Sequence, residues 1–342
     1  MPTFLVTGAS GYIASWIVTY LLEQNYEVHA TVRSLRDSLK TTYLRELLKR
    51  YPEKLKLFEA DLLDRESFRT PMEGCDIVLH TASPFFITKI KDVHRDLIQP
   101  ALEGTRNVLG MASEFPAIRR IVVTSSVAAV YSDAVDIGSA KNGQFDETMW
   151  NTGSSEKHNP YQYSKTLAEK EAWKIAKNQS QFDLVTINPG FVMGPSLSKR
   201  IDSTSIDTMR SLINGKYRSG VPDLWFGVVD VRDVARAHIL AATRPEASGR
   251  YICVGHSVPL RDMALILRES HPDRPIPKSL VPNFLLYLAG PLMGFSWKFL
   301  RNNLGISYLF NAKKSLTLGL KYTPLKETLS DHASQLINDR LV

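Results

Sequence analysis

The sequence predicts an α/β fold: a doubly wound parallel sheet of the Rossmann type, with a smaller substrate domain interleaved towards the C-terminus. Three observations support this prediction. Short, continuous apolar runs alternate with helical patterns through the first half of the chain, and a glycine-rich turn follows the first run. After Pro189 the rhythm changes to a stretch rich in Gly, Pro and Ser. Continuous apolar strands separated by helices are typical of a parallel sheet covered on both faces.

The expected strands of the first half lie at residues 3–7, 27–32, 55–59, 76–80, 120–124 and 183–187. The helical patterns between them lie near 11–24, 39–50, 92–113 and 160–178. Further strand-like pieces follow at 227–231 and 251–255, and the tail, 256–342, is helical and rich in loops. We therefore expect an NADP-binding Rossmann domain made of 1–189 and 227–255, and a substrate-binding domain made of 190–226 and 256–342.

The bulk composition is that of an ordinary globular protein, with 44% hydrophobic and 23% charged residues in 342. A formal charge of +7 raises the question of a nucleic-acid or membrane surface. The bases, however, occur as scattered doublets with acids between them, which favours solvated faces and a pocket for an anionic ligand over nucleic-acid binding. The doublets are Lys49-Arg50, Arg119-Arg120, Lys199-Arg200 and Lys313-Lys314.

The cellular setting is inferred from the cysteines and from the start of the chain. Cys75 and Cys253 both lie in apolar runs, which favours buried thiols in a reducing compartment over a disulfide. The first strand begins at Thr3, which leaves no room for a signal peptide, so we expect a cytoplasmic protein. We expect it to be a monomer or a homodimer.

The segment LVPNFLLYLAGPLMGFSW, residues 280–297, is apolar enough to be mistaken for a membrane span. It contains two prolines and an asparagine and lacks an uninterrupted apolar run of about 20 residues. We expect no membrane span there, and a helix pair that covers the substrate or contacts a second subunit instead.

The first strand leads into TGASGYIAS, in which Gly8 suits a tight turn and Gly11 allows the backbone to approach a pyrophosphate. The third small position, Ala14, allows close packing of helix on strand. A plain turn is the alternative, but this one follows a strand and opens the helix at 11–24, where free N–H groups favour an anion. We therefore predict that a dinucleotide binds here.

The end of the second strand indicates which dinucleotide. An acid about 20 residues past the loop would bind the ribose 2′-hydroxyl of NAD, but ATVRS has none, and the first acid is Asp37. Arg33 would instead offer a planar cation to a 2′-phosphate, assisted by Arg36 or Lys40. The alternative is a solvated arginine on a loop, so the missing acid favours NADP(H).

Two other strand ends carry candidate cofactor contacts. Asp61 and Leu62 leave the third strand where an adenine ring would lie, although Asp61 as a helix cap would look the same. The small residues Thr81, Ala82 and Ser83 follow the fourth strand, at the carboxyl edge where ligands of open α/β sheets bind.

The stretch NPYQYSK, residues 159–165, contains two tyrosines before a lysine. Asn159 is a good N-cap and Pro160 suits the first helical position, so Tyr161 falls in the first turn. Tyr161 and Lys165 are four residues apart and share a helix face, whereas Tyr163 points roughly 200° away from Tyr161. Only Tyr161 can therefore share a pocket with Lys165, and Tyr163 is a packing residue.

The fifth strand ends in Ser125 and Ser126 at the same carboxyl edge. A nearby ammonium and a positive helix end both favour tyrosinate, and lowering a tyrosine pKa from about 10 to about 7.5 needs roughly 3.4 kcal/mol. Such a tyrosine can donate its proton to a carbonyl oxygen, while a serine hydroxyl holds that oxygen. A Tyr-x-x-x-Lys pair is common on surface helices, but here the glycine loop and the serine pair favour catalysis.

Other catalytic constellations are not found. The eight histidines show no metal-ligand spacing, so no metal is expected, and no Gly-x-Ser-x-Gly elbow occurs.

With these residues in place, the chain resembles the extended short-chain dehydrogenase/reductases. Within them it resembles the group of dihydroflavonol reductases, cinnamoyl-CoA reductases and aldehyde or ketone reductases. The stretches that carry the resemblance run over nearly the whole chain: VTGASGYIASWIV (6–18), ATVRS (30–34), HTASP (80–84), EGTRNVL (103–109), VVTSSVAAVY (122–131), YQYSKTLAEKEAW (161–173), NPGFVMGP (188–195), VDVRDVARAHI (229–239) and, more weakly, FNAKKSLTLGLKYTPLKETL (310–329).

The resemblance implies an NADPH-dependent carbonyl reductase with Tyr161 as proton donor, Lys165 as its partner and as a ligand of the nicotinamide ribose, and Ser126 (or else Ser125) orienting the substrate. For the cofactor it implies the phosphate loop, the 2′-phosphate site, the adenine site and the nicotinamide contacts. These are Gly8, Ser10, Gly11, Tyr12 and Ile13; Arg33 and Lys40; Asp61 and Leu62; and Pro189, Val192 and Ser205.

Two departures from the sequence signatures of this group narrow the range of expected substrates. NPYQYSK stands where the cinnamoyl-CoA reductases carry a longer tryptophan–tyrosine–cysteine signature, which counts against a CoA thioester. Tyr131 stands where the plant flavonoid enzymes have a substrate-reading asparagine, which counts against a flavonoid. A hydrophobic aldehyde or ketone is the expected substrate.

Three alternatives are kept open. A sugar-nucleotide epimerase or dehydratase usually prefers NAD, which Arg33 opposes, and a hydroxysteroid dehydrogenase would share most of the motifs. A non-catalytic NADP sensor would have no need of Tyr161 and Lys165.

Overall fold

The computed structural model describes residues 1–83, 92–199 and 201–342. Its centre is a seven-stranded sheet in the order β10-β7-β5-β4-β1-β2-β3, in which every neighbouring pair is parallel. The strands are β1 (Thr3–Thr7), β2 (Glu27–Val32), β3 (Leu55–Glu59), β4 (Ile77–His80), β5 (Arg120–Thr124), β7 (Asp183–Pro189) and β10 (Gly249–Cys253). The predicted fold class is confirmed, and most strand ends agree with the sequence pattern to within two residues.

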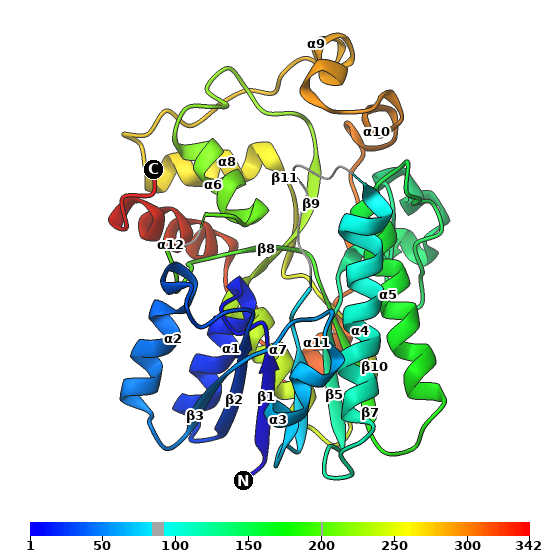
Figure 1. Ribbon diagram of the computed structural model, residues 1–342. Coiled ribbons are helices and arrows are strands. Elements are labelled where there is room, and N and C mark those ends of the chain that lie inside the picture. The colour runs from blue at the N-terminus through cyan, green and yellow to red at the C-terminus, as the bar shows by residue number, and fades with distance from the viewer. Residues whose placement is uncertain (84–91, 200) are drawn as a thin grey trace.

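Helices cover both faces of this sheet (Figure 1). One face carries α1 (Tyr12–Glu23), α2 (Ser38–Arg50) and α7 (Val231–Thr243), and the other carries α4 (Gln99–Ala112) and α5 (Pro160–Lys177). Within β1, Phe4 and Val6 pack into the core on the α1 side, and Leu5 packs into the core on the α4 side. Alternation of this kind is what a strand buried on both faces requires.

The strand order reverses at β1, which lies between β2 and β4. In open α/β sheets such a reversal opens a crevice at the carboxyl ends of the strands, because the connections on its two sides run in opposite directions. The loops after β1, β4 and β5 all end at this edge. The fold therefore brings the glycine loop, Thr81–Ser83 and the serine pair to one side of the sheet.

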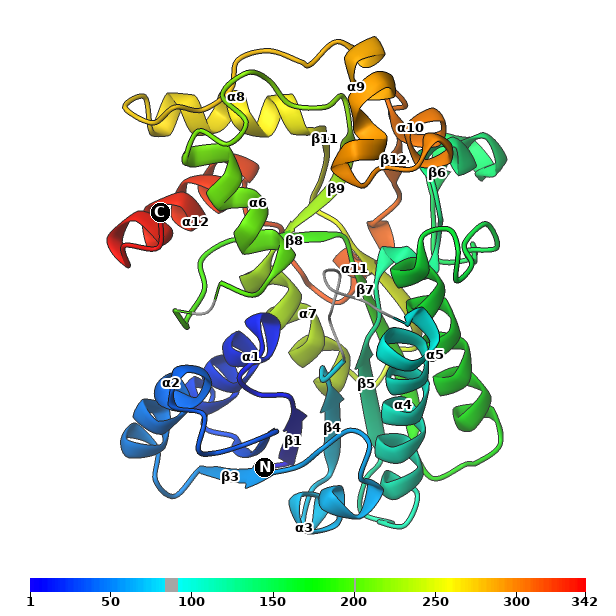
Figure 2. The same ribbon diagram turned by 45° about the horizontal axis from the view of Figure 1, so that its top comes forward.

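The second half of the chain builds a smaller body above this edge (Figure 2). A three-stranded sheet contains β8 (Phe191–Met193), β9 (Trp225–Asp230) and β11 (His256–Pro259), and a core with α6 (Thr204–Ile213), α8 (Leu260–Ser270) and α12 (Leu325–Asn338) packs against it. The expected strand at 227–231 thus lies in the small sheet, whereas α7 and β10, which follow it, belong to the large one. The proposed domain boundaries stay a prediction.

The remaining elements are short. They are η1 (Arg65–Phe68), α3 (Arg69–Met72), η2 (His94–Ile98), η3 (Val127–Ala129), η4 (Ala134–Ser139), η5 (Lys141–Gly143), α9 (Asn283–Ala289), η6 (Gly290–Met293), α10 (Trp297–Asn303), α11 (Lys313–Thr317), and the paired strands β6 (Gln144–Phe145) and β12 (Leu309–Phe310). Cys75 and Cys253 are free and buried, as expected. Within the described residues, no helix combines the length and the apolar character that crossing a membrane would demand.

The chain passes from the large sheet to the small one through Gly190, between β7 and β8. A Cβ atom on Gly190 would lie 2.1 Å from the carbonyl oxygen of Gly227 and 2.9 Å from Cγ2 of Val254. Both sheets therefore depend on the missing side chain at this crossing, because the obstructing oxygen belongs to backbone and cannot turn away.

We predict that Gly190→Ala lowers the free energy of unfolding by about 1–3 kcal/mol or more, since it forces backbone apart in a packed region. The matched control is Gly138→Ala, where an added Cβ meets nothing within 4 Å and which should leave stability near wild type. Urea denaturation of the three proteins measures the difference. Equal unfolding midpoints for the two variants would contradict the packing argument.

Candidate active site

The turn after β1 forms a tight cradle at the start of α1. Gly8 has φ +65°, and a Cβ atom there would lie 3.0 Å from both Cα and Cβ of Ala82, in the loop after β4. Gly11 donates its N–H to the Gly8 carbonyl at 2.8 Å, and α1 then begins with no side-chain cap. Glycine is thus required at position 8 both by its φ and by the close approach of two loops, and the uncapped helix start fits the predicted pyrophosphate.

The side chains around this cradle are held by the protein itself. The Tyr12 hydroxyl donates to the carbonyl of Gly194, and burial raises the pKa of Tyr12 well above its usual range. Ser10 and Ile13 are half-buried at the same turn, and Ile13 packs against the core of the large sheet. The N–H groups of Gly8, Ala9 and Gly11 have partners within the protein, so the N–H groups in the uncapped first turn of α1 are the ones that suit a phosphate.

The two cations expected at a 2′-phosphate lie next to carboxylates. Nε of Arg33 is 3.7 Å from Oδ2 of Asp61, with the Arg33 side chain 69% exposed. Nζ of Lys40 is 3.1 Å from Oδ2 of Asp37, the residue that caps α2. Exposed ion pairs of this kind contribute little to stability, so an incoming phosphate can compete for both cations.

The predicted adenine contacts lie beyond Arg33. Asp61 accepts the N–H of Leu63 at 2.9 Å, within a turn, as well as facing Arg33. It is not a helix cap, because the cap of the next helix, η1, is Asp64. Leu62 packs against α4, where a Cβ atom on Gly104 would be 3.2 Å from it. Leu62 also lines a cavity together with Ala82, Ser83 and Lys165, which connects the predicted adenine side with the catalytic side.

The loop after β4 is fastened to β1. The Thr81 hydroxyl donates to the carbonyl of Thr7 at 2.5 Å, and the N–H of Ala82 donates to the Thr7 hydroxyl at 3.1 Å. Ser83, the next residue, accepts a hydrogen bond from Nζ of Lys165 at 3.0 Å. Pro84, which completes the HTASP stretch, lies outside the described residues.

Ser126 and Tyr161 are brought together by β5 and α5. Ser126 follows β5 and lies beside the phenol of Tyr161, which is in the first turn of α5. Lys165 places its ammonium 6.0 Å from the centroid of the Tyr161 ring. Ser125 points elsewhere: it is buried, and its hydroxyl donates to Glu169 at 2.5 Å. The geometry thus supports Ser126 over Ser125 as the substrate-orienting serine.

The expected direction of the Tyr161 pKa is wrong for this state. Burial raises the pKa of Tyr161 to about 12, against the smaller lowering effect of the hydrogen bond from Ser126. Burial lowers the pKa of Lys165 to about 8, which Glu169 partly opposes. The loss of solvent around the phenol outweighs the nearby ammonium and the helix end, and Lys165 is directed to Ser83. Tyr161 therefore keeps its proton at neutral pH.

The start of α5 also differs from the expected cap. Asn159 has a left-handed conformation, φ 52°, and makes no side-chain cap; its amide donates instead to the Ser132 carbonyl at 3.0 Å and to Asp133 at 2.9 Å. Asp133 is buried and also contacts His158 at 2.6 Å and the amide of Asn303 in α10 at 2.7 Å. Asn159 thus ties the first turn of α5 to a neighbouring loop and to the C-terminal half of the chain.

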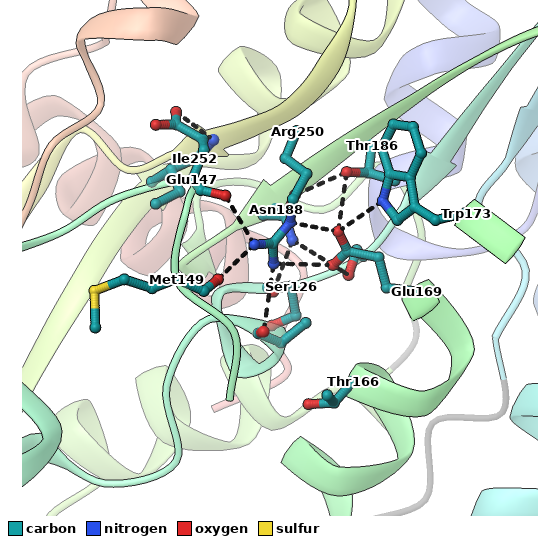
Figure 3. A network of polar contacts seen from close by, with 12 residues as sticks. Ser126, Glu147, Met149, Thr166, Glu169, Trp173, Thr186, Asn188, Arg250 and Ile252 are labelled. Atoms are coloured by element: carbon teal, nitrogen blue, oxygen red, sulfur yellow. Dashed lines mark hydrogen bonds and ion pairs between the residues drawn. The ribbon is translucent and has the colours of Figure 1, made fainter. Parts of the chain in front are cut away.

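A buried network behind the candidate catalytic residues is not predicted from the sequence (Figure 3). Glu169, in α5, accepts Nε of Arg250 from β10 at 2.6 Å and Nδ2 of Asn188 from β7 at 2.7 Å. Asn188 also donates to the Ser126 carbonyl at 3.1 Å. The network joins the helix that carries Tyr161 and Lys165 to the strand ends that carry the serines.

Two signals in the sequence point to this network. Glu169 follows Lys165 by four residues and so shares its helix face, and Arg250 is a charge inside an otherwise apolar strand. Arg250 has further partners besides Glu169. Its Nη1 donates to the carbonyls of Glu147 at 2.9 Å and Met149 at 2.5 Å, and its guanidinium carbon lies 3.9 Å from the ring centroid of Trp150.

The last three expected cofactor contacts lie where the large sheet meets the small one. Pro189 is buried at the end of β7, and Val192 in β8 packs against the core of the large sheet. Ser205 is buried in the first turn of α6, which belongs to the core of the small sheet. The structure thus places Pro189 and Val192 at the crossing between the sheets, and Ser205 on the smaller body.

Comparison with known proteins gives a consistent picture. The NAD dependent epimerase/dehydratase family profile matches residues 4–255. "Cinnamoyl-CoA reductase CAD2" of Medicago truncatula is 39% identical over 97% of this chain and 94% of its own length, and "Tetraketide alpha-pyrone reductase 1" of Arabidopsis thaliana is 35% identical over the same shares. The crystal structure of Gre2 in complex with NADPH from Candida albicans superposes with a TM-score of 0.81 at 31% identity, over 99% of both chains.

We predict that Glu169→Ala lowers the free energy of unfolding by about 3–5 kcal/mol, because it leaves the Arg250 guanidinium buried without its carboxylate. Denaturant unfolding followed by far-UV circular dichroism measures the loss. The matched control is Lys326→Ala, which breaks an exposed ion pair with Glu269 and should leave the midpoint near wild type. If both variants unfold at the same midpoint, the buried pair does not support the site.

Proposed function

The chain belongs to the NAD dependent epimerase/dehydratase family, and we propose that within it the protein is an NADPH-dependent reductase of a hydrophobic aldehyde or ketone. The observation that carries the proposal is the juxtaposition of Ser126, Tyr161 and Lys165 at the sheet edge that also holds the glycine cradle. The enzyme is an oxidoreductase that acts on carbonyl and CH–OH groups.

NADP(H) is the cofactor. The cradle of Gly8 and Gly11 fits its pyrophosphate, and Arg33 and Lys40 are the cations available for a 2′-phosphate. The solved structures of Gre2 from yeast and from Candida albicans, at 30% and 31% identity, are NADPH complexes. When bound, NADPH supplies the hydride.

The chain's own residues handle the proton. Tyr161, with a pKa of about 12, is protonated at neutral pH and can therefore donate to a carbonyl oxygen as negative charge develops there. The Ser126 hydroxyl, already within hydrogen-bond reach of Tyr161, holds the same oxygen. Lys165, whose pKa is about 8, is mostly charged at pH 7 and stabilises the tyrosinate that proton donation leaves.

The substrate side favours an apolar carbonyl compound. Tyr131 does not offer a free hydroxyl: it pairs with the Tyr308 hydroxyl at 3.0 Å and stacks on Phe145 at a centroid distance of 4.6 Å. A polar group of a flavonoid thus finds no free donor at this position. A CoA thioester is a second candidate, because several of the relatives at 35–39% identity are cinnamoyl-CoA reductases.

The test is an NADPH-consumption screen across aromatic aldehydes, β-ketoesters, diketones, flavanonols, steroids and cinnamoyl-CoA. Turnover of apolar aldehydes or ketones supports the proposal, and turnover of cinnamoyl-CoA alone would replace it by the second candidate. Inactivity on all of them, with tightly bound NAD and conversion of a sugar nucleotide, would identify an epimerase or dehydratase instead.

We predict that Tyr161→Phe lowers kcat about 10²–10⁴-fold while NADPH still binds, since the change removes only the proton that general acid catalysis uses. Steady-state kinetics measures kcat, and quenching of protein fluorescence measures cofactor binding. Tyr163→Phe, two residues along on another face of α5, is the control and should keep near-normal turnover. Near-normal turnover by Tyr161→Phe would show the mechanism to be wrong.

We predict that Arg33→Ala raises the KM for NADPH about tenfold or more and leaves the KM for NADH nearly unchanged, because only NADPH loses a charge-assisted hydrogen bond. Parallel kinetics with both cofactors measures the ratio. Lys49→Ala, an exposed base in the last turn of α2, controls for the change in net charge. An equal effect on both cofactors would reject the 2′-phosphate assignment.

A further inference from the structure

A hairpin of short helices presents large apolar side chains to solvent. It consists of α9, η6 and α10, and it lies at the top of the molecule, at the end of the small body (Figures 1 and 2). Five side chains form what we term the apolar tip: Phe284, Leu285, Leu288, Leu292 and Trp297, which are 70%, 41%, 75%, 92% and 58% exposed. Elsewhere, exposed residues such as Leu39 and Leu316 stand singly, which is ordinary for a protein surface.

The side chains of the apolar tip are not exposed because the hairpin is poorly packed. The hairpin has a core of its own, in which Leu286, Leu300 and Leu304 are buried against Val281, Phe295 and other apolar neighbours. Tyr287 and Trp297 stack with their ring centroids 6.1 Å apart. The tip residues therefore belong to a folded unit that holds them outward, and an exposed group of this kind marks a contact surface.

The charge around the hairpin is unusual for this chain. Residues 275–326 contain seven basic side chains and no acidic one, which accounts for the whole net charge of +7. In the rest of the chain the numbers of basic and acidic side chains are equal, whereas in this interval the bases have no acids to balance them. Lys278, Lys298 and Arg301 are exposed beside the tip, whereas Lys314 and Lys326 bind the Ser248 carbonyl and Glu269. Asp223, near Gly305 at the base of the hairpin, is partly buried.

We propose that the apolar tip docks on the surface of an anionic lipid bilayer. Its leucines and aromatic rings enter the boundary of headgroups and acyl chains, and Lys278, Lys298 and Arg301 contact the headgroup phosphates. Aromatic and leucine side chains flanked by bases are the composition of interfacial segments, and each base near an anionic leaflet adds to the attraction.

The charge of the hairpin argues against a contact between two copies of the chain, and the length of its helices argues against a membrane span. In a symmetric contact with a second copy, the two tips would bring their own bases together, and the interval 275–326 holds no acid to pair them. A span is excluded by length, because α9 and α10 have seven residues each and a membrane-crossing helix needs about 20.

The experiment is co-sedimentation of the full chain with vesicles of phosphatidylcholine alone or of phosphatidylcholine with phosphatidylserine. We expect binding to the anionic vesicles only, weakening as salt is raised, because exposed charges are screened. Leu288→Asp/Leu292→Asp should lower partitioning about tenfold or more, and so should Lys298→Glu/Arg301→Glu. The matched controls, Leu316→Asp on α11 and Lys49→Glu on α2, should bind like the wild type.

Two results would overturn the proposal. The first is a vesicle assay in which the tip variants sediment to the same extent as the wild type and the controls, whether all of them bind or none does. The second is a dimer in light scattering that Leu288→Asp/Leu292→Asp converts to a monomer, which would make the tip a contact between two copies. Thermal unfolding confirms that each variant is folded, and the charge variant tests the surface independently of the leucines.

Discussion

The buried ion pair between Glu169 and Arg250 is the interaction on which the arrangement of the site depends. Glu169 lies one helical turn after Lys165 in α5, and Arg250 lies on β10, at the edge of the large sheet. Between them, Asn188 reaches Glu169 and the backbone of Ser126. A charge buried this deeply is tolerated only when its partners are in place, so the pair permits one rotation of α5 relative to the strands. That rotation directs Tyr161 and Lys165 toward Ser126 and Ser83.

A second constraint acts on the cofactor side, where the loops after β1 and β4 touch. Gly8 and Ala82 leave no room for another atom, and Thr7 holds both loops through its hydroxyl and its carbonyl. Ser83 then receives Lys165 from α5. The same short loop thus forms the back of the glycine cradle and supplies one hydrogen-bond partner of Lys165. The glycine cradle and Lys165 are therefore connected through the loop after β4.

Much of this could be predicted from sequence, because the sheet has apolar strands and the motifs are local. The first strands and helices were located to within a few residues, and the order of the site residues along the sheet edge follows from the fold class. Contacts between distant segments could not be predicted. Nothing local in NPYQYSK shows that the Asn159 amide donates to Ser132 and Asp133. Similarly, the local pattern of residues 227–231 does not show that this strand pairs in the small sheet and not in the large one. Glu169 and Arg250 are 81 residues apart, and only the closed sheet makes them partners.

The pKa of Tyr161 differs in direction from what the residues next to it in sequence predict. The sequence places an ammonium and a helix start beside the phenol, and both favour tyrosinate. Burial opposes them and prevails, so the phenol keeps its proton with a pKa of about 12, while the same burial brings Lys165 down to about 8. A protonated phenol beside a mostly charged lysine is the state that a reductase needs before turnover, because the carbonyl oxygen must receive a proton. In the opposite direction Tyr161 would have to lose its proton first, at a cost of about 1.4 kcal/mol for each pH unit below its pKa. The protonated state of Tyr161 is therefore the one that the proposed proton donation to a carbonyl oxygen requires.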